Sequence, residues 1–182
     1  MTDSRIDIRH GEPADASAVL RLLDDAIAWM VDRGATRQWG TQPASQNSRF
    51  VRHVRAFAES GGLYLATVDG RVAGALSVGD AHDYVAAVDE PELYVQLLVT
   101  RRRYAGLGVG ARLLDHARDL ARERGIDLLR VDCFAGNDGK LVAYYEGQGF
   151  ERTESFTVDK PDGPWPGQVL GQRLGRSPEA SR

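Results

Sequence analysis

The sequence predicts an α/β protein of the α+β type, a three-layer α-β-α sandwich around one mixed, mostly antiparallel sheet of about six or seven strands. Two apolar segments flank Asp69-Gly70, a pair typical of a two-residue hairpin turn. Residues 92–100 form a nearly continuous apolar run of strand length, as in a buried central strand. Apolar residues at helical spacing then follow in residues 109–124. Because predicted helices are scattered between strands, they would cover both faces of one sheet.

The first half of the chain supplies a strand and two helical segments before the hairpin. Alternating residues in 5–11 predict a first strand. Residues 12–34 predict one helix or two short ones, with Asp15 or Ser17 as a cap and Gly34 as the stop. Residues 49–62 predict a short amphipathic helix closed by two glycines.

The second half alternates strands and helices to its end. Residues 126–134 predict a strand, and residues 139–150 contain a short helix. Residues 151–158 and 168–174 predict two closing strands, joined by the turn-rich segment DKPDGPWPG. We expect a single domain over residues 1–176 and a disordered tail over 177–182.

Composition excludes several classes of function. The net charge of −3 gives no global basic field, so we expect no nucleic-acid partner. No apolar run approaches the roughly 20 residues of a membrane span, and the N-terminus lacks the apolar stretch of a signal peptide. The single cysteine, Cys133, excludes an intrachain disulfide, which favours a cytoplasmic location.

The stretch RRRYAGLGVGARLL, residues 101–114, carries the strongest functional signal. Glycines stand at 106, 108 and 110, between the buried strand and the amphipathic helix, with three arginines before them. A helix N-terminus offers unpaired N–H groups and the positive end of the helix dipole. Glycines remove the β-carbons that would keep a phosphate away from those amides, and they permit positive φ. The stretch therefore predicts a pyrophosphate site.

Two other phosphate-binding motifs fit less well. The lysine and hydroxyl residue of nucleoside triphosphatases are absent, because Ala111 and Arg112 follow Gly110. Gly106, Gly108 and Ala111 satisfy G-x-G-x-x-A, with Asp132 where a ribose-binding acid would stand. An NAD(P)-dependent oxidoreductase is nevertheless disfavoured. Thr100–Ala105 separate the strand from the first glycine, and about 50 residues after Asp132 are too few for a doubly wound sheet.

The same stretch resembles the acyl-CoA loop of the GCN5-related N-acetyltransferase (GNAT) superfamily, whose pattern is Arg or Gln, two residues, Gly, one residue, then Gly or Ala. Arg103, Gly106 and Gly108 fit the letters of this pattern. Ala105, Gly108 and Gly110 better fit the spacing to Leu113-Leu114 and are preferred, although Ala105 departs from the usual Arg or Gln.

The resemblance covers most of residues 5–175. It includes the apolar strand ending in Leu97, Leu98 and Val99, the later Asn137, and the ending Tyr145-Glu146-x-x-Gly149-Phe150. It implies a sheet splayed at the acyl-CoA site and acetyl transfer from acetyl-CoA to a primary amine by direct attack in a ternary complex. The implied coenzyme site consists of Leu98, Val99, Arg103, Ala105, Gly106, Leu107, Gly108, Val109, Gly110, Ala111 and Asn137.

The resemblance also implies catalytic roles. Tyr145 matches the tyrosine that protonates the departing sulfur, whereas Tyr144 is interpreted as a core residue. The general base is left open among Glu92, Gln96, Asp132 and His82. Trp39 and Trp165 are expected in loops, either packing those loops or lining an acceptor pocket. Cys133 is interpreted as a core residue rather than a nucleophile.

No metal is expected, because Asp80, His82 and Asp83 form a solvated loop cluster rather than a ligand set. The acceptor would be a small-molecule or peptide amine, and the protein a monomer or homodimer without a membrane partner. A non-catalytic acyl-CoA sensor that keeps the loop is the alternative outside the enzymes. The sequence does not distinguish acetyl from longer acyl donors.

Overall fold

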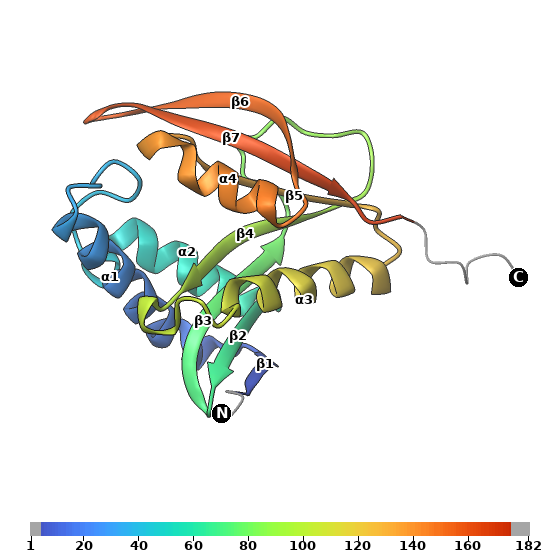
Figure 1. Cartoon of the computed structure of the whole chain (residues 1–182), viewed down its shortest axis with the longest axis horizontal. Coiled ribbons are helices and arrows are strands. Elements are labelled where there is room, and N and C mark those ends of the chain that lie inside the picture. Colours follow the sequence, from blue (N-terminus) through green and yellow to red (C-terminus); the bar gives the residue numbers. More distant parts are fainter. Residues whose placement is uncertain (1–4, 176–182) are drawn as a thin grey trace, which may run out of the picture. The chain divides into compact units, whose positions relative to one another are not determined.

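The computed structural model describes residues 5–175, so the expected tail at 177–182 lies outside the described residues. Within them, seven strands form one mixed sheet in the order β1-β2-β3-β4-β5-β7-β6, with four α-helices (Figure 1). The strands are β1 (Ile6–His10), β2 (Leu63–Val68), β3 (Arg71–Gly79), β4 (Glu92–Thr100), β5 (Leu128–Phe134), β6 (Glu151–Lys160) and β7 (Gly163–Arg173). The helices are α1 (Ala16–Asp32), α2 (Ser48–Glu59), α3 (Val109–Glu123) and α4 (Lys140–Gly147), with 3-10 turns η1 (Pro13–Asp15), η2 (Ala44–Gln46), η3 (Arg102–Tyr104) and η4 (Asn137–Gly139).

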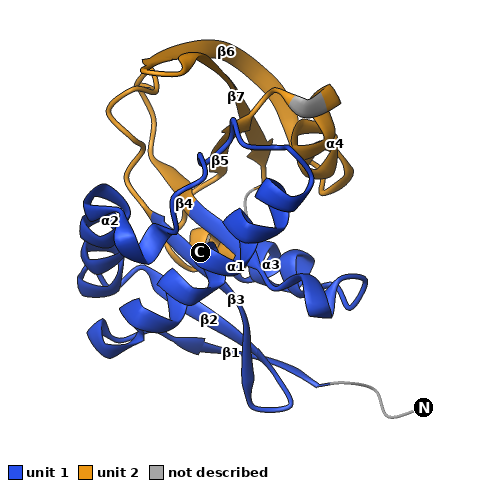
Figure 2. Ribbon diagram, turned by 90° about the vertical axis from the view of Figure 1, so that its left-hand side faces the viewer, with its two compact units in different colours: residues 1–78, 97–116 blue, residues 79–96, 117–182 orange. Residues whose placement is uncertain are grey.

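The chain forms two compact units (Figure 2). The first contains the described residues up to Val78 and then Leu97–His116. The second contains Gly79–Gln96 and the described residues from Ala117 onward. Strand β4 and helix α3 each contribute residues to both units.

The first unit is organised by the predicted hairpin. Strands β2 and β3 pair in antiparallel register around Asp69 and Gly70, whose φ values are 49° and 79°. A turn with positive φ at both central residues matches the right-handed twist of the strands that it joins. Strand β1 adds on the other side of β2, again antiparallel. The hairpin and the first strand predicted from the sequence are therefore confirmed.

Helices cover both faces of this hairpin. Leu63, Leu65 and Ala75 pack into one core with buried residues of α1 and α2. On the other face, a β-carbon at Gly74 would meet Val109 and Leu113 of α3 at 3.1 Å, so α3 packs closely there. Successive strand residues point to opposite faces. Gly74 therefore faces α3, whereas the adjacent Ala75 faces α1 and α2. Leu22 and Leu23 of α1 and Leu113 of α3 are fully buried or nearly so.

Of the two predicted alternatives, one helix or two short ones, the structure has one α-helix of 17 residues, α1, preceded by the 3-10 turn η1. Asp15 stands at its N-cap position, but its carboxylate accepts hydrogen bonds from Arg9 and from the backbone of Glu12 instead of capping α1. Gly34 follows the helix with φ of 69°, as expected for a C-terminal stop.

The second unit contains the parallel part of the sheet. Glu92–Val95 of β4 pair in parallel with Leu128–Val131 of β5. Strand β7 pairs antiparallel with both β5 and β6. The strands β6 and β7 are longer than the sequence indicated, since β6 reaches Lys160 and β7 begins at Gly163. Most of the segment described as turn-rich is therefore strand, because the pairing of β6 with β7 continues to Lys160 and Gly163 and leaves only Pro161 and Asp162 as the turn.

No helix within residues 5–175 is long and apolar enough to cross a bilayer.

Candidate active site

The glycine loop joins β4 to α3 and leaves the start of α3 accessible. Gly106 and Gly108 have φ values of 84° and 79°, and α3 begins at Val109. Ala105 to Gly108 are exposed, and a β-carbon on Gly106 or Gly108 would meet nothing within 4 Å. Helix geometry leaves the first four N–H groups, those of Gly108, Val109, Gly110 and Ala111, without partners inside the helix. The first bond that closes onto the loop runs from Arg112 N–H to the Gly108 carbonyl.

These features suit a diphosphate. Gly106 and Gly108, both in the left-handed conformation, leave the amides at the positive end of α3 exposed. Neither glycine has a β-carbon that would keep a phosphate away from these amides. Gly110, in contrast, lies inside the first turn of α3 and has no positive φ. Gly108 belongs to both registers considered from the sequence, and Gly106 belongs to the register Arg103, Gly106 and Gly108, so the preference for Ala105, Gly108 and Gly110 stays a prediction.

The three arginines before the loop do not act as one cluster. Arg101 Nε lies 3.6 Å from a carboxylate oxygen of Asp25 in α1. The guanidinium of Arg102 lies 3.5 Å from the centre of the Trp29 ring. Burial, and secondarily the charge of Arg33, lowers the pKa of Arg102 from its usual value. Two of the three cations thus contact α1, whereas exposed Arg103 lies over the ring of Tyr104.

Leu98 and Val99 lie near the end of β4, in the first unit. Val99 is buried in the core with α1 and α2, and Leu98 is half-buried. The β4 end is anchored by a hydrogen bond from Arg101 N–H to the Ala73 carbonyl of β3.

Tyr145 lies on α4 with 5% of its surface exposed. Its ring meets those of Tyr144 and Phe150 edge to face, with centroids 5.4 and 5.7 Å apart. Burial raises the pKa of Tyr145 well above its usual value, and the nearby Cys133, Tyr144 and Asp132 add to that rise. The phenol is protonated in the neutral range, as any tyrosine of ordinary pKa is, and burial makes its proton harder to release.

Two neighbours of Tyr145 show how burial differs along α4 and β5. Tyr144, interpreted from the sequence as a core residue, is 39% exposed, so that interpretation was wrong. A helical residue next to a buried one turns about 100° away from it, which brings Tyr144 to the surface. Cys133 is buried, and burial with the Asp132 charge raises the pKa of its thiol to about 12. Such a thiol is a poor nucleophile at neutral pH.

Asp132 is held by two phenols. Tyr94 of β4 donates a hydrogen bond of 2.6 Å to Oδ1, and Tyr84 donates one of 3.3 Å to Oδ2. His82 stacks on the Tyr84 ring at 5.1 Å and meets the Tyr94 ring edge to face at 5.8 Å. Burial and the Asp132 charge together raise the pKa of Tyr94 far above its usual value. The four residues form one cluster, which we call the Asp132 cluster.

Glu92 and Gln96 occupy the same face of β4 as Tyr94 but have other partners. Arg130, 3% exposed in its side chain, contacts Glu92 at 2.9 Å and Glu154 at 3.1 Å. Gln96 donates a hydrogen bond to the Asp80 carbonyl. Glu92 is thus committed to a buried ion pair, and Gln96 to the loop after β3. His82 Nε2 lies 3.4 Å from the Gln96 carbonyl.

The two tryptophans lie in different settings. Trp39 is in an irregular segment, as expected. Its ring meets the Phe50 ring of α2 edge to face, with the ring centroids 6.4 Å apart. Trp165, expected in a loop, is instead part of β7, so this expectation was wrong. Its ring lies 5.4 Å from Phe134 and 6.1 Å from Phe156. The β-hairpin formed by β6 and β7 incorporates Trp165 because its register pairs Trp165 with Val158.

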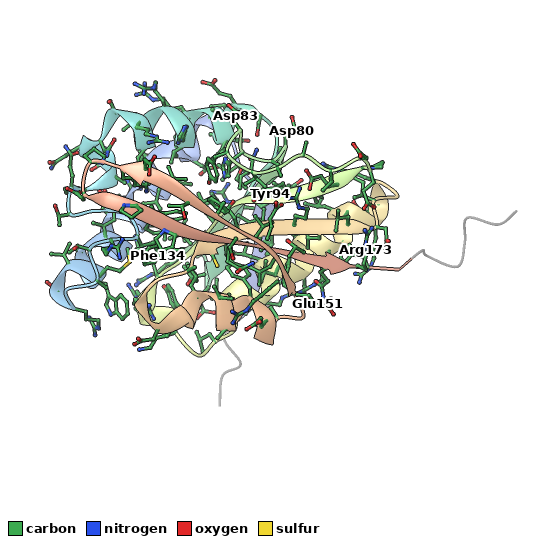
Figure 3. The ribbon with its side chains drawn as sticks, turned by 90° about the horizontal axis from the view of Figure 1, so that it is seen from above. Asp80, Asp83, Tyr94, Phe134, Glu151 and Arg173 are labelled. Carbon is green, nitrogen blue, oxygen red and sulfur yellow. The ribbon has the colours of Figure 1, made fainter. Side chains whose placement is uncertain are left out.

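Asn137 begins the 3-10 turn η4, and its side chain lies outside what the structure describes. Asp80 and Asp83 are exposed on the loop after β3, and Figure 3 labels them together with Tyr94. Across residues 5–175, no group of three or more His, Cys, Asp or Glu side chains is arranged to hold a metal ion.

Sequence reasoning missed Tyr84, Tyr94 and Arg130. Tyr94 lies between Glu92 and Gln96 at a spacing of two, within a strand that is otherwise apolar. That spacing indicates a polar face on β4. On β5, Arg130 pairs with Tyr94 in the strand register and Asp132 accepts its hydrogen bond, and these two residues are also two positions apart.

Comparison with known proteins gives consistent results. The sequence model described as "Acetyltransferase (GNAT) family" matches residues 44–150. An uncharacterized N-acetyltransferase of Bacillus subtilis, YesJ, is 28% identical over 148 residues, which cover 75% of this chain and 77% of YesJ.

Solved structures share the fold. A ribosomal-protein-alanine N-acetyltransferase from Brucella melitensis is 22% identical with a TM-score of 0.66, over 92% of this chain and 99% of that one. The putative acetyltransferase yncA from Salmonella typhimurium, solved with acetyl-CoA, is 20% identical with a TM-score of 0.66, over 97% and 99%.

Proposed function

Because the chain belongs to the acetyltransferase (GNAT) family and is an acyl-CoA-dependent N-acetyltransferase, we propose that it transfers acetyl from acetyl-CoA to a primary amine by direct attack in a ternary complex. The observation that carries this proposal is the pair of left-handed glycines, Gly106 and Gly108, which bare the first amides of α3. We also assign both units to one domain, residues 1–176, since β4 and α3 each belong to both.

The glycine loop binds the diphosphate of the coenzyme. The N–H groups of Gly108 to Ala111 donate to phosphate oxygens, and the dipole of α3 adds favourable charge. Arg103 lies over the ring of Tyr104, whereas Arg101 and Arg102 contact α1, and Arg103 adds a cation beside the loop. Leu98 and Val99 offer backbone groups to the pantetheine arm, as an added strand would. Asn137 supplies an amide to the same arm.

Acetyl-CoA supplies an activated thioester, so the protein need only orient it, deprotonate the amine and protonate the departing sulfur. Tyr145 matches the tyrosine that donates a proton to the sulfur in the family, and its phenol is protonated at neutral pH, so we assign it as the proton donor. Among the four candidates for the base, Glu92 is held in an ion pair by the buried Arg130, and the Gln96 amide is no base at neutral pH. Asp132 and His82 remain as proton acceptors for the amine.

Two measurements test the proposal. In thermal-shift assays, acetyl-CoA and CoA should raise Tm while NAD and NADP should not, since a ligand at 100 times its Kd stabilises by about 2.7 kcal/mol. Stabilisation by NAD alone would refute the assignment. Thiol release from acetyl-CoA across a panel of primary amines then separates an enzyme from a sensor. CoA binding without turnover of any amine would favour the acyl-CoA sensor.

A further inference from the structure

A row of aromatic side chains runs across one face of the second unit. Centroid distances link His82 to Tyr84 at 5.1 Å, Tyr84 to Phe156 at 5.4 Å, and Phe156 to Trp165 at 6.1 Å. We call these four residues the aromatic row. They come from the loop after β3 and from strands β6 and β7, so only folding brings them together.

Strand alternation places this row and Cys133 on opposite faces of the sheet. Asp132 and Cys133 are neighbours on β5 and therefore point to opposite faces. Asp132 contacts Tyr84 of the row. The opposite face carries Gln172, which accepts a hydrogen bond from Arg118 of α3 and lies 2.7 Å from where a β-carbon on Gly149, just after α4, would stand. The helices cover that face, and the aromatic row with Asp132 lies on the other.

The charge beside the row is negative. Asp132 is half-buried. Its recorded hydrogen-bond donors within residues 5–175 are the neutral phenols of Tyr84 and Tyr94. Arg130, two residues away, forms ion pairs with both Glu92 and Glu154. These three side chains together carry a net negative charge, so Arg130 does not offset the charge of Asp132. A half-buried carboxylate bordered by rings favours a cation, and it disfavours an anion by repulsion.

The row already binds one primary ammonium. Lys160 Nζ lies 4.6 Å from the centroid of the Trp165 ring, within the range of a cation–π contact. The face of the row thus accepts the chemical group that the proposed reaction consumes. Lys160 is held at the end of β6 and occupies the Trp165 end of the row, whereas Asp132 adjoins the Tyr84 end.

We infer that the aromatic row and Asp132 form the acceptor subsite, which selects a positively charged primary amine with a flat apolar body and without a carboxylate on the amine-bearing carbon. Asp132 binds the ammonium, and the rings of Tyr84, Phe156 and His82 contact the apolar body. This inference rests on the proposed function and specifies its substrate class.

The test compares paired acceptors that differ by one carboxylate. Phenethylamine and phenylalanine share an aromatic body, as do tryptamine and tryptophan. Thiol release should give each amine a kcat/KM at least about tenfold above its amino acid, since the extra carboxylate of the amino acid would be repelled by Asp132. Equal use of both members of each pair by the unmodified enzyme would overturn the inference.

Variants then locate the selection. Asp132→Asn should raise KM for phenethylamine about tenfold or more and abolish the preference over phenylalanine. Tyr84→Phe keeps the ring and should preserve KM better than Tyr84→Ala. Asp119→Asn, an exposed carboxylate on α3, is the matched control and should leave the preference intact. A preference that persists in Asp132→Asn would overturn the inference even if that variant turns over slowly.

CoA affinity, measured on every variant by thermal shift, separates this test from that of the proposed function. Normal CoA binding and amine turnover without charge selection would reject the subsite alone. If the unmodified protein does not bind CoA at all, the enzyme assignment itself is rejected. Should Asp132→Asn not fold, the paired acceptors and the Tyr84 variants still decide the outcome.

Discussion

Tyr94 on β4 donates a 2.6 Å hydrogen bond to Asp132 on β5, from the same face of two parallel strands. Because β4 and β5 pair Tyr94 with Arg130, the phenol reaches diagonally to the next residue on that face. The bond fixes one oxygen of the Asp132 carboxylate and leaves the other to the weaker, 3.3 Å contact with Tyr84. The same carboxylate is thus both held in place by a buried donor and bordered by an exposed ring.

Replacing Tyr145 with Phe should remove the proton donor while keeping the packing of α4. We expect kcat to fall by about 10²–10⁴-fold, the usual contribution of a general acid, with little change in CoA affinity. Steady-state kinetics and CoA thermal shift measure the two effects. Tyr144→Phe is the matched control, because this exposed neighbour should keep full activity. Undiminished kcat in Tyr145→Phe would remove this residue from the mechanism.

Gly108→Ala should weaken CoA binding about tenfold or more, because a β-carbon would stand among the amides at the start of α3. Left-handed φ also costs an L-residue about 1–2 kcal/mol of folding stability. Gly125→Ala controls for that cost, since Gly125 has a φ of 67°, equally open surroundings and a place after the far end of α3. Calorimetric titration with CoA should find only Gly108→Ala impaired, and equal affinities in both variants would contradict the loop assignment.

Arg130→Ala should lower the free energy of unfolding by about 3–5 kcal/mol, because it leaves Glu92 largely buried without its partner. Urea denaturation measures this loss. Arg122→Ala, which removes an exposed arginine paired with Asp119, should change stability by no more than about 0.5 kcal/mol. A similarly small effect at Arg130 would contradict the stabilising role assigned to its buried ion pair with Glu92.

The raised pKa of Tyr94 predicts a loss of stability in alkali. The unfolded tyrosine ionises near pH 10, whereas the folded phenol keeps its proton above that pH. The folded state then binds more protons than the unfolded state, so stability is complete below about pH 10 and falls as pH rises further. Urea denaturation between pH 9 and 11 should show a shallower fall in Tyr94→Phe, by up to about 1.4 kcal/mol per pH unit. Parallel curves for the two proteins would contradict the burial of this phenol.

Local chemistry allowed much of this protein to be predicted from its sequence. Some features depend only on residues that are neighbours in the sequence, so a short stretch of sequence is enough to predict them. They are the Asp69-Gly70 turn, the strand at residues 92–100, the helix stop at Gly34 and the glycine loop before α3. The motifs that indicate a GNAT acetyltransferase are equally local, and the match to that family's sequence model confirms the membership. The roles of single residues at the site stay predictions.

What the sequence could not show depends on contacts between distant segments. Glu92 and Asp132 look alike as acids beside a strand, but folding gives Glu92 an arginine 38 positions away and gives Asp132 two phenols. Adjacent Tyr144 and Tyr145 are equivalent in pattern, and only the packing of α4 buries one of them. The aromatic row likewise exists only once strand pairing brings β6, β7 and the loop after β3 together. Strand register and burial, which join residues far apart in the chain, decided these properties.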